Sequence, residues 1–170
     1  HVTHSQEEAM ALADLIVVMS DGRIEQAASP REVFERPASA FVARFMGDHN
    51  VIAGTVSAVG AGAVEIVVAG AGKFMAIGSE LPIGSAVAAA IRTDHVRLGV
   101  SPSPGLGFTG TVSNVEYRGG TVKLSIDGDG VEDFTAIVDD VSFFKTPVSI
   151  GDAVPVHWEA TDAIVLGRPD

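Results

Sequence analysis

Two patterns of hydrophobic and polar residues divide the chain near Asn50. Before that point apolar residues recur at helical spacing, as in Ala9–Ala13 and again at Phe41, Val42 and Phe45. From Asn50 onward Val, Ile and Thr alternate with small or polar residues, and glycine pairs separate the runs. The pattern therefore predicts a short mixed α/β segment followed by strands alone.

Serines mark the expected helix starts in the first segment. Ser5, Ser29 and Ser39 each precede an apolar helical pattern, where a serine hydroxyl can accept a hydrogen bond from a free backbone N–H. Glu32 stands three residues after Ser29, which completes a capping box. Gly47 follows the last apolar pair and predicts a helix end. Three short helices are expected.

Strands are also expected in this segment. Val2–Thr3 is typical of the end of a buried strand, and Leu15–Met19 is a continuous apolar run that predicts a strand covered on both faces. Asp21-Gly22 is a strong signal for a hairpin turn, and Arg23–Ala27 fits the returning strand.

The stretch from Val51 to Gly72 is long enough to cross a membrane and contains one charge, Glu65. However, Val64, Ile66 and Val68 alternate at period two, and glycine or polar residues interrupt the run. Hairpin strands explain this pattern better than a lipid-facing helix.

An internal repeat runs through the strand-rich part. Three segments recur in the same order, at offsets of 56, 67 and 68 residues. Two such copies, intertwined or packed together, could close a barrel and hide their strand edges. Ser101–Gly105 is the expected link between the copies. The pairs are Gly54–Val59 with Gly110–Val115, Ile83–Val87 with Ile150–Val154, and His95–Gly99 with Ala163–Gly167.

Composition limits the functions that remain. The 170 residues carry a formal charge of −11, contain 46% hydrophobic residues and include no cysteine. A disulfide scaffold and a cysteine zinc site are excluded, and the apolar fraction argues against a disordered chain. The negative charge disfavours binding to nucleic-acid phosphates.

Several short motifs resemble known binding sites, but the residues around them do not fit those sites. Gly105–Gly110 fits the dinucleotide pattern, but a Ser-Pro linker precedes it and a strand is expected after it. Gly72-Lys73 lacks the Ser/Thr and the first glycine of a phosphate-binding loop. Asp127–Gly130 lacks the further oxygen ligands of a calcium loop and predicts a hairpin turn. The five histidines show no zinc-binding spacing, so no metal site is expected.

One string carries a specific resemblance. Val2–Asp14, "VTHSQEEAMALAD", resembles the switch-histidine loop of the ATP-binding subunits of ABC importers. The match continues in order through Ile16–Met19, Asp21–Gln26, Ser29–Phe34, Arg36–Ser39, Phe41–Ala43 and Phe45–Asp48. Further on, Ala90–Val96, Val115–Gly120 and Trp158–Ala163 resemble the TOBE region of such subunits. The resemblance covers essentially the whole chain.

The resemblance implies a fold and a domain division. The expected fold is mainly β: a TOBE-type, OB-like barrel built from two repeated halves and preceded by a short α/β remnant of a nucleotide-binding domain. Residues 1–49 would be that remnant, and residues 50–170 the regulatory barrel domain. We expect the chain to be the C-terminal part of a longer subunit, with His1 lying inside the larger domain.

The resemblance also implies a mechanism. His4 matches the switch histidine, which in the family reaches the γ-phosphate of ATP and helps to position the attacking water. ATP and Mg²⁺ would be held by upstream motifs of the parent subunit, so this chain by itself is not expected to hydrolyse ATP. Other positions that match the family's regulatory region are Arg92, Asp94, Glu116, Tyr117, Gly119 and Gly120.

The implied partners are membrane permease subunits, a second copy of the ATP-binding subunit and, indirectly, a solute-binding protein. The location would be peripheral, on the cytoplasmic side of the membrane. Gly47-Asp48 and Asn50, followed by Gly54–Val56, point within the family to polyamine-type importers. Ser5, Leu15 and Thr93-Asp94 depart from the usual residues of the family.

Two alternatives remain beside this interpretation. Paired TOBE-like barrels can bind oxyanions such as molybdate, although the charge of −11 opposes anion capture. Small Greek-key barrels often bind oligonucleotides, but such sites need stacking aromatic residues and a basic groove. With one Trp, one Tyr and 11 basic residues, the chain does not favour nucleic acid.

Overall fold

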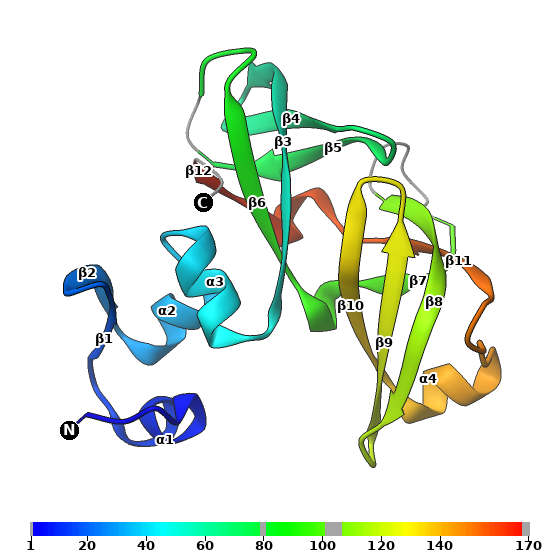
Figure 1. Cartoon of the computed structure of the whole chain (residues 1–170), viewed down its shortest axis with the longest axis horizontal. Coiled ribbons are helices and arrows are strands. Elements are labelled where there is room, and N and C mark those ends of the chain that lie inside the picture. Colours follow the sequence, from blue (N-terminus) through cyan, green and yellow to red (C-terminus); the bar gives the residue numbers. More distant parts are fainter. Residues whose placement is uncertain (1, 79–80, 101–106, 168–170) are drawn as a thin grey trace.

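A computed structural model describes residues 2–78, 81–100 and 107–167 of the chain. Its helices are short, and three of them precede residue 47 (Figure 1). The helices are α1 (Gln6–Leu12), α2 (Pro30–Glu35), α3 (Ala40–Met46) and α4 (Asp140–Lys145), with 3-10 turns η1 (Thr93–His95) and η2 (Ala160–Asp162).

The strands form three groups. A two-stranded hairpin contains β1 (Ile16–Ser20) and β2 (Arg23–Ala28). The first barrel is closed and has the order β12-β5-β4-β3-β6, and the second sheet has the order β10-β9-β8-β11-β7. Their strands are β3 (His49–Gly60), β4 (Ala63–Val68), β5 (Gly72–Ile77), β6 (Ala86–Arg92), β7 (Arg97–Leu98), β8 (Gly107–Tyr117), β9 (Thr121–Gly128), β10 (Val131–Asp139), β11 (Ala153–His157) and β12 (Ala163–Gly167).

The predicted helix caps are confirmed. The hydroxyls of Ser5, Ser29 and Ser39 accept hydrogen bonds from backbone N–H groups at the starts of α1, α2 and α3. The capping box of Ser29 and Glu32 is complete. Gly47 ends α3 with φ +81°, a left-handed conformation that glycine adopts without steric cost.

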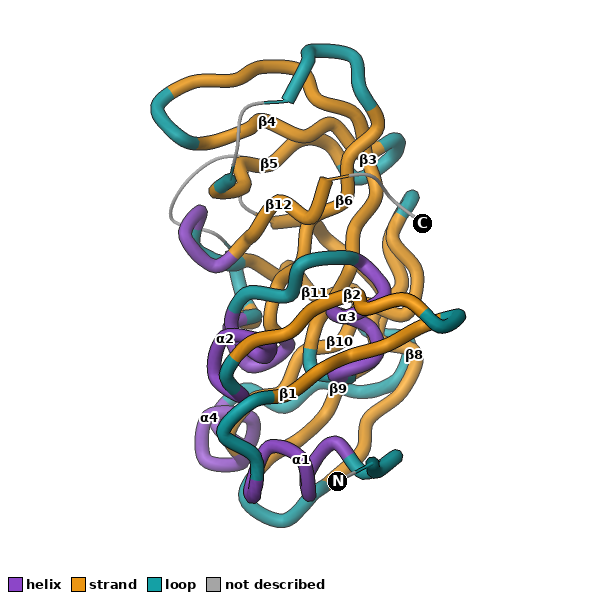
Figure 2. The backbone as a smooth tube through the Cα atoms, turned by 90° about the vertical axis from the view of Figure 1, so that its left-hand side faces the viewer, coloured by secondary structure: helices purple, strands orange, loops and turns teal. Residues whose placement is uncertain are grey.

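The β1–β2 hairpin turns at Asp21-Gly22, as predicted. Both residues have positive φ, 48° and 74°, which a type I′ turn requires. The hairpin crosses helices α2 and α3 (Figure 2). Ile16 and Val18 point toward these helices and share a small core with Val33, Val42 and Met46.

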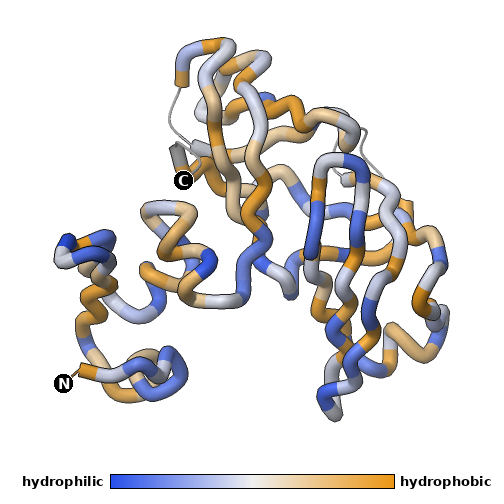
Figure 3. Tube along the Cα trace, in the orientation of Figure 1, coloured by the Kyte–Doolittle hydropathy of each residue, from blue (hydrophilic) through white to orange (hydrophobic). Residues whose placement is uncertain are grey.

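The opposite face of the hairpin corrects two predictions. Val17 and Met19 are 45% and 57% exposed, so β1 is covered on one face and not on both. Val2 is 91% exposed and lies in no strand. A continuous apolar run indicates two-sided burial only where layers pack on both sides, and here the helices supply one layer. Figure 3 shows the hydrophobic residues of this N-terminal part.

The two copies of the repeat exchange their last strands. β3 to β6 build most of the first barrel, yet β7, which follows them, pairs with β11 of the second sheet. In return β12, at the end of the second copy, pairs with β5 and β6 of the first barrel. The sequence left open whether the two halves are intertwined or packed together, and the strand order shows that they are intertwined.

Local details repeat as well. The pairing of β3 with β4 shifts register between Val56 and Ala58, and that of β8 with β9 shifts between Val112 and Asn114. In each copy a valine at this bulge exchanges backbone hydrogen bonds with the turn before the next strand: Val56 with residues 84–85, and Val112 with residues 151–152. The mainly β fold with two repeated halves behind a short α/β segment is therefore as predicted.

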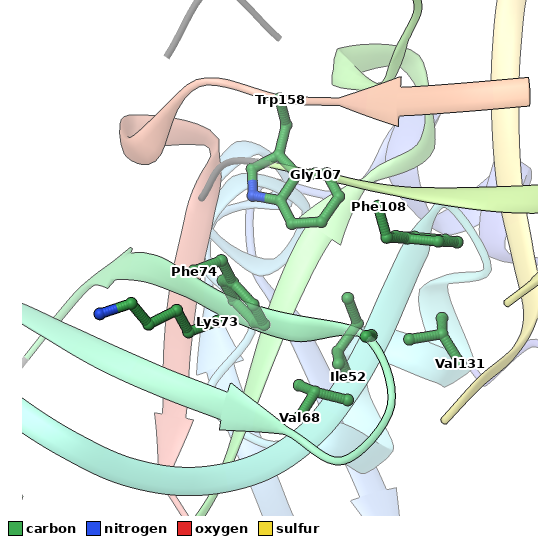
Figure 4. A pocket seen from close by; sticks show the side chains of 9 residues that line it. Ile52, Val68, Lys73, Phe74, Gly107, Phe108, Val131 and Trp158 are labelled. Carbon is green, nitrogen blue, oxygen red and sulfur yellow. The ribbon is translucent and has the colours of Figure 1, made fainter. Parts of the chain in front are cut away.

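The main core lies between the two halves and centres on Trp158, which is 2% exposed. Its ring contacts Phe74 of the first barrel and Phe134 of the second sheet, with centroids 5.5 and 5.7 Å away. Phe108 packs edge-on against Phe134 at 5.0 Å. Figure 4 shows Trp158, Phe74 and Phe108 around a cavity of about 10 Å³, which is no larger than one water molecule requires.

Helix α3 joins the N-terminal part to the first barrel. Ala40 and Ala43 pack against Ala88 and Ala90 of β6, together with Leu166. All four alanines are at most 1% exposed. Small side chains on both sides let the helix approach the strand closely, so the contact is tight rather than a loose linker.

Helix α4 was not predicted, since only strands were expected after Asn50. Asp139 caps it by accepting a hydrogen bond from Ser142 N, at 2.8 Å. Phe143 is buried at 2% exposure, while Val141 and Phe144 are 62% exposed. The predicted turn in Asp127–Gly130 is confirmed between β9 and β10. The expected link Ser101–Gly105 lies outside the described residues.

Candidate functional site

His4, the predicted switch histidine, lies exposed just before α1. Two hydrogen bonds fix the chain around it: Ser5 Oγ accepts from Glu8 N at 3.2 Å, and Thr3 Oγ1 donates to Glu8 Oε2 at 2.6 Å. Gln6 Nε2 also donates to the carbonyl oxygen of Phe45, at the end of α3. The backbone on both sides of His4 is thus anchored while its imidazole faces solvent.

Arg92 and Asp94 form an ion pair at the end of β6. Arg92 Nε and Nη2 donate to Asp94 Oδ1 and Oδ2 at 3.0 and 2.6 Å. These bonds raise the pKa of Arg92. Partial burial opposes ionisation of Asp94, but the bonds from Arg92 outweigh it and lower the pKa of that carboxyl. The guanidinium also lies 4.8 Å above the ring of Phe34 in α2.

His49, at the start of β3, was not predicted as a functional residue. Its ring lies edge-on to Phe34 at 5.7 Å and is 9% exposed. Neither ring nitrogen has a hydrogen-bond partner among the described residues. Burial, and then the nearby charge of Arg92, lowers the pKa of His49 to about 4, so the ring is neutral at pH 7.

The other predicted positions lie together in the hairpin that joins β8 to β9. Glu116 accepts two hydrogen bonds from Arg118, at 3.0 and 3.1 Å, which lower the pKa of the carboxyl. Gly119 has φ +80°, and Gly120 O accepts from Asp140 N at the start of α4. Both glycines therefore serve the turn and its contact with α4.

Tyr117 is 63% exposed and stacks on Phe144 of α4, with centroids 6.1 Å apart and ring planes 7° from parallel. The structure thus places the predicted residues in three groups: His4 before α1, Arg92 with Asp94 at the end of β6, and Glu116 to Gly120 in the β8–β9 hairpin. Figure 1 shows α1 and this hairpin in separate parts of the molecule.

A cleft of about 470 Å³ opens beside Arg92, between α2 and the first barrel. It is lined by the end of α2, by β3, β5, β6 and β12, and by η1 and η2. Sequence reasoning missed this cleft. Within its lining, His95 Nδ1 of η1 lies 2.9 Å from Asp162 Oδ1 of η2. The lining residues are Glu35, Arg36, His49, Ile77, Gly78, Ala90, Arg92, His95, Thr161, Asp162 and Ile164.

Comparison with known proteins shows which families this chain resembles. Residues 89–166 match the TOBE domain family. The spermidine/putrescine import ATP-binding protein PotA of Oleidesulfovibrio alaskensis is 36% identical over 98% of the chain. The chain contains a TOBE domain and is related by sequence to the ATP-binding subunits of ABC importers.

Other relatives share the TOBE-containing part and name different cargoes. The sulfate/thiosulfate import ATP-binding protein CysA 1 of Chromobacterium violaceum is 42% identical over 75% of the chain. The Fe(3+) ions import ATP-binding protein FbpC of Brucella suis is 40% identical over the same share. The chain spans 47% of the length of the PotA relative, 33% of CysA 1 and 35% of FbpC.

A solved structure resembles most of the chain in fold. The cytoplasmic molybdate-binding protein ModG, with molybdate bound, superposes with a TM-score of 0.62 and 26% identity. The match covers 71% of this chain and 96% of ModG. None of the helices in the described parts of the chain is long and apolar enough to span a bilayer.

Proposed function

We propose that this chain is the C-terminal, regulatory part of an ATP-binding subunit that drives an ABC importer. The observation that carries the proposal is the 36% identity to PotA over 98% of the chain, which includes the N-terminal segment with His4 as well as the TOBE domain. In this proposal residues 1–49 belong to the ATPase domain and residues 50–170 form the regulatory barrel domain.

In this proposal, His4 is the residue of this chain that takes part in ATP hydrolysis. ATP with Mg²⁺, bound by the remainder of the subunit, supplies the phosphoryl group that is transferred to water. His4 is exposed and its neighbours are anchored by Ser5 and Glu8, which suits a side chain that must meet a nucleotide on another surface. An imidazole can donate a hydrogen bond to a phosphate oxygen and stabilise charge that develops there.

The exposed apolar face of the hairpin supports the same proposal. Val17, Met19 and Ile24 of the hairpin, with Leu12 of α1 and Leu15 before β1, are between 45% and 77% exposed. Burial of such a face against the rest of an ATPase domain would be favourable, at roughly 25 cal/mol per Å² of apolar surface. Partners in this proposal are permease subunits, a second ATP-binding subunit and, indirectly, a solute-binding protein, at the cytoplasmic face of the membrane.

A chimera tests the proposal. This chain replaces the matching C-terminal part of the O. alaskensis relative, and ATPase activity and polyamine uptake are measured. We expect both to persist, and His4→Ala to reduce ATP hydrolysis by about 10²-fold or more, as for loss of one transition-state donor. Glu7→Gln, an exposed neighbour, is the matched control and should leave the rate within twofold. A chimera that folds but has no activity, or that is indifferent to His4→Ala, contradicts the proposal.

The isolated chain provides a second measurement. Because the proposal assigns the nucleotide-holding groups to the remainder of the subunit, the purified chain should show no ATP turnover above that of the His4→Ala variant. Turnover that depends on His4 in the isolated chain would contradict this division of labour.

A second candidate function is oxyanion binding, and the observation that favours it is the likeness to ModG with molybdate bound. The formal charge of −11 opposes it. Calorimetric titration of the chain with molybdate, tungstate and sulfate distinguishes the two functions, since a regulatory barrel without this activity gives no heat of binding.

A further inference from the structure

The cleft between α2 and the first barrel contains both signs of charge, but its carboxylates are already engaged. Asp162 accepts from His95 Nδ1 at 2.9 Å, and Glu35 pairs with Arg31 Nε at 2.9 Å on the outer side of α2. Asp94, beside the cleft, holds Arg92 through two bonds. Each of these three carboxylates therefore already has a partner within the protein.

The hydrogen-bond donors that line the cleft have fewer partners within the protein. Arg36, exposed at the end of α2, has its guanidinium in no ion pair within 4 Å among the described residues, although its charge helps to lower the pKa of Glu32 one turn earlier. Thr161 of η2 also lines the cleft and is exposed, so its hydroxyl is accessible to a ligand. Arg92 commits Nε and Nη2 to Asp94, which leaves Nη1 with its two protons. The hydrogen-bonding capacity that remains in the cleft is thus mostly that of donors and positive charge.

His49 adds a buried group that lacks a partner. It borders the cleft, is nine-tenths buried and makes no hydrogen bond with either ring nitrogen in the described part of the chain. A buried polar side chain without a partner is destabilising, so such groups are uncommon in folded proteins unless they serve a ligand or water.

The remaining lining is apolar or small: Ile77, Gly78, Ala90 and Ile164. A volume of about 470 Å³ falls within the range of small-molecule sites, which is roughly 300–1,000 Å³. It is much larger than a single inorganic ion requires. An occupant that fits has an apolar body against these side chains and an anionic head toward the donors.

We propose that this cleft is a binding site for a small organic anion that carries a phosphate or carboxylate head, with Arg36, which follows α2, and Thr161 of η2 as its polar contacts. Such a ligand bridges the N-terminal segment and the barrel. Its consequence for regulation, a change in how α2 sits on the barrel, rests on the proposed function, whereas the binding itself does not.

Direct titration of the 170-residue chain tests the site without ATP or a transporter. The probe is phenyl phosphate, the neutral control is benzyl alcohol, and the cationic control is putrescine. Binding is followed by the NMR signals of the histidine ring nitrogens. We expect saturable binding of phenyl phosphate with shifts of the His49 and His95 signals, and binding of benzyl alcohol and putrescine at least tenfold weaker.

Variants test the named contacts. Arg36→Gln removes a charge-assisted hydrogen bond and should weaken binding about tenfold or more, and Thr161→Val about three- to tenfold. Arg23→Gln, which changes the charge equally on an exposed strand outside the cleft, should change the affinity less than twofold. The proposal is overturned if phenyl phosphate does not bind at millimolar concentration, if either control compound binds as tightly, or if Arg36→Gln and Arg23→Gln have the same effect.

Discussion

The side chain of Asn50 pairs with the backbone of Thr135 from the other half of the molecule. Asn50 Nδ2 donates to Thr135 O at 2.8 Å, and Asn50 Oδ1 accepts from Thr135 N at 2.7 Å. Asn50 is 6% exposed and lies on β3, whereas Thr135 lies on β10. One amide thus satisfies both backbone groups of a residue 85 positions away and joins the first barrel to the second sheet.

Replacement of this amide should be costly. Asn50→Ala leaves the N–H and C=O groups of Thr135 without their partner, and each such unpaired group costs about 1–3 kcal/mol. We expect a loss of about 2–4 kcal/mol in the free energy of unfolding, measured with urea. Asn114→Ala, at an exposed position of β8, is the control and should change stability by less than about 0.5 kcal/mol. Equal effects of the two changes would refute the role of Asn50.

Alanine substitutions at Gly130 and Gly62 distinguish the cost of a steric clash from the cost of backbone strain. Their φ angles are 75° and 76°, but a Cβ at Gly130 would lie 1.9 Å from Ala69 O, while a Cβ at Gly62 would meet nothing within 4 Å. Both alanine variants share the cost of a positive φ. Gly130→Ala should destabilise the fold by about 1–3 kcal/mol more than Gly62→Ala in the same urea measurement, because the β4–β5 and β9–β10 turns touch there. Similar losses in both variants would show that the turns are not in contact.

The neutral state of His49 gives stability a dependence on pH. Its pKa is lowered from 6.5 to about 4 in the folded chain, so below pH 6.5 the unfolded chain binds a proton that the folded chain does not. The stability contribution is complete above about pH 7 and declines as the pH falls toward 4. Between pH 7 and pH 5 this loss amounts to roughly 2 kcal/mol.

His49→Leu removes this titration, because leucine binds no proton in either state. Urea unfolding at pH 7 and pH 5 should show a smaller difference in the variant than in the parent chain. Acidic residues titrate mainly below this window and are common to both proteins. An unchanged difference would mean that the His49 ring is already protonated in the folded chain at pH 5.

Strand exchange should make the two halves unfold together. Ile66 and Ile126 occupy equivalent positions in the two copies, opposite Val56 and Val112, and both are fully buried. Ile66→Ala and Ile126→Ala should each cost about 2–5 kcal/mol. Since Trp158 contacts both halves, its fluorescence and the far-ultraviolet circular dichroism should follow one transition in either variant. Two separate transitions would contradict the coupling of the halves.

Local chemistry made much of this fold predictable. Ser29 with Glu32, Asp21-Gly22 and Gly47 act through contacts within a few residues, so their effect can be inferred directly from the sequence. The repeat further predicted two halves, either intertwined or packed together. Helix α4 escaped prediction because Val141, Phe143 and Phe144 are strand-forming residues, and the packing of Phe143 into the core outweighs that preference.

Some candidate sites could likewise be located from the sequence, and others could not. His4 and the Glu116–Gly120 hairpin could be placed by motif, and their functional roles stay predictions. The cleft could not be found from sequence, since Arg36, His49, Arg92, His95 and Thr161 belong to five different elements. Each of these residues is ordinary in its own segment, and only their juxtaposition has chemical meaning.

The sequence by itself determined the turns, the caps, the alternating strands and their duplication, because each depends on neighbours along the chain. The tertiary structure decided that β7 and β12 change places and that a donor-lined cleft opens beside α2. The physical reason is that the backbone groups of a strand edge pair equally well with any suitable strand. Side-chain packing around Trp158 and the close contact of α3 with β6 select one arrangement from the many that backbone hydrogen bonding would permit.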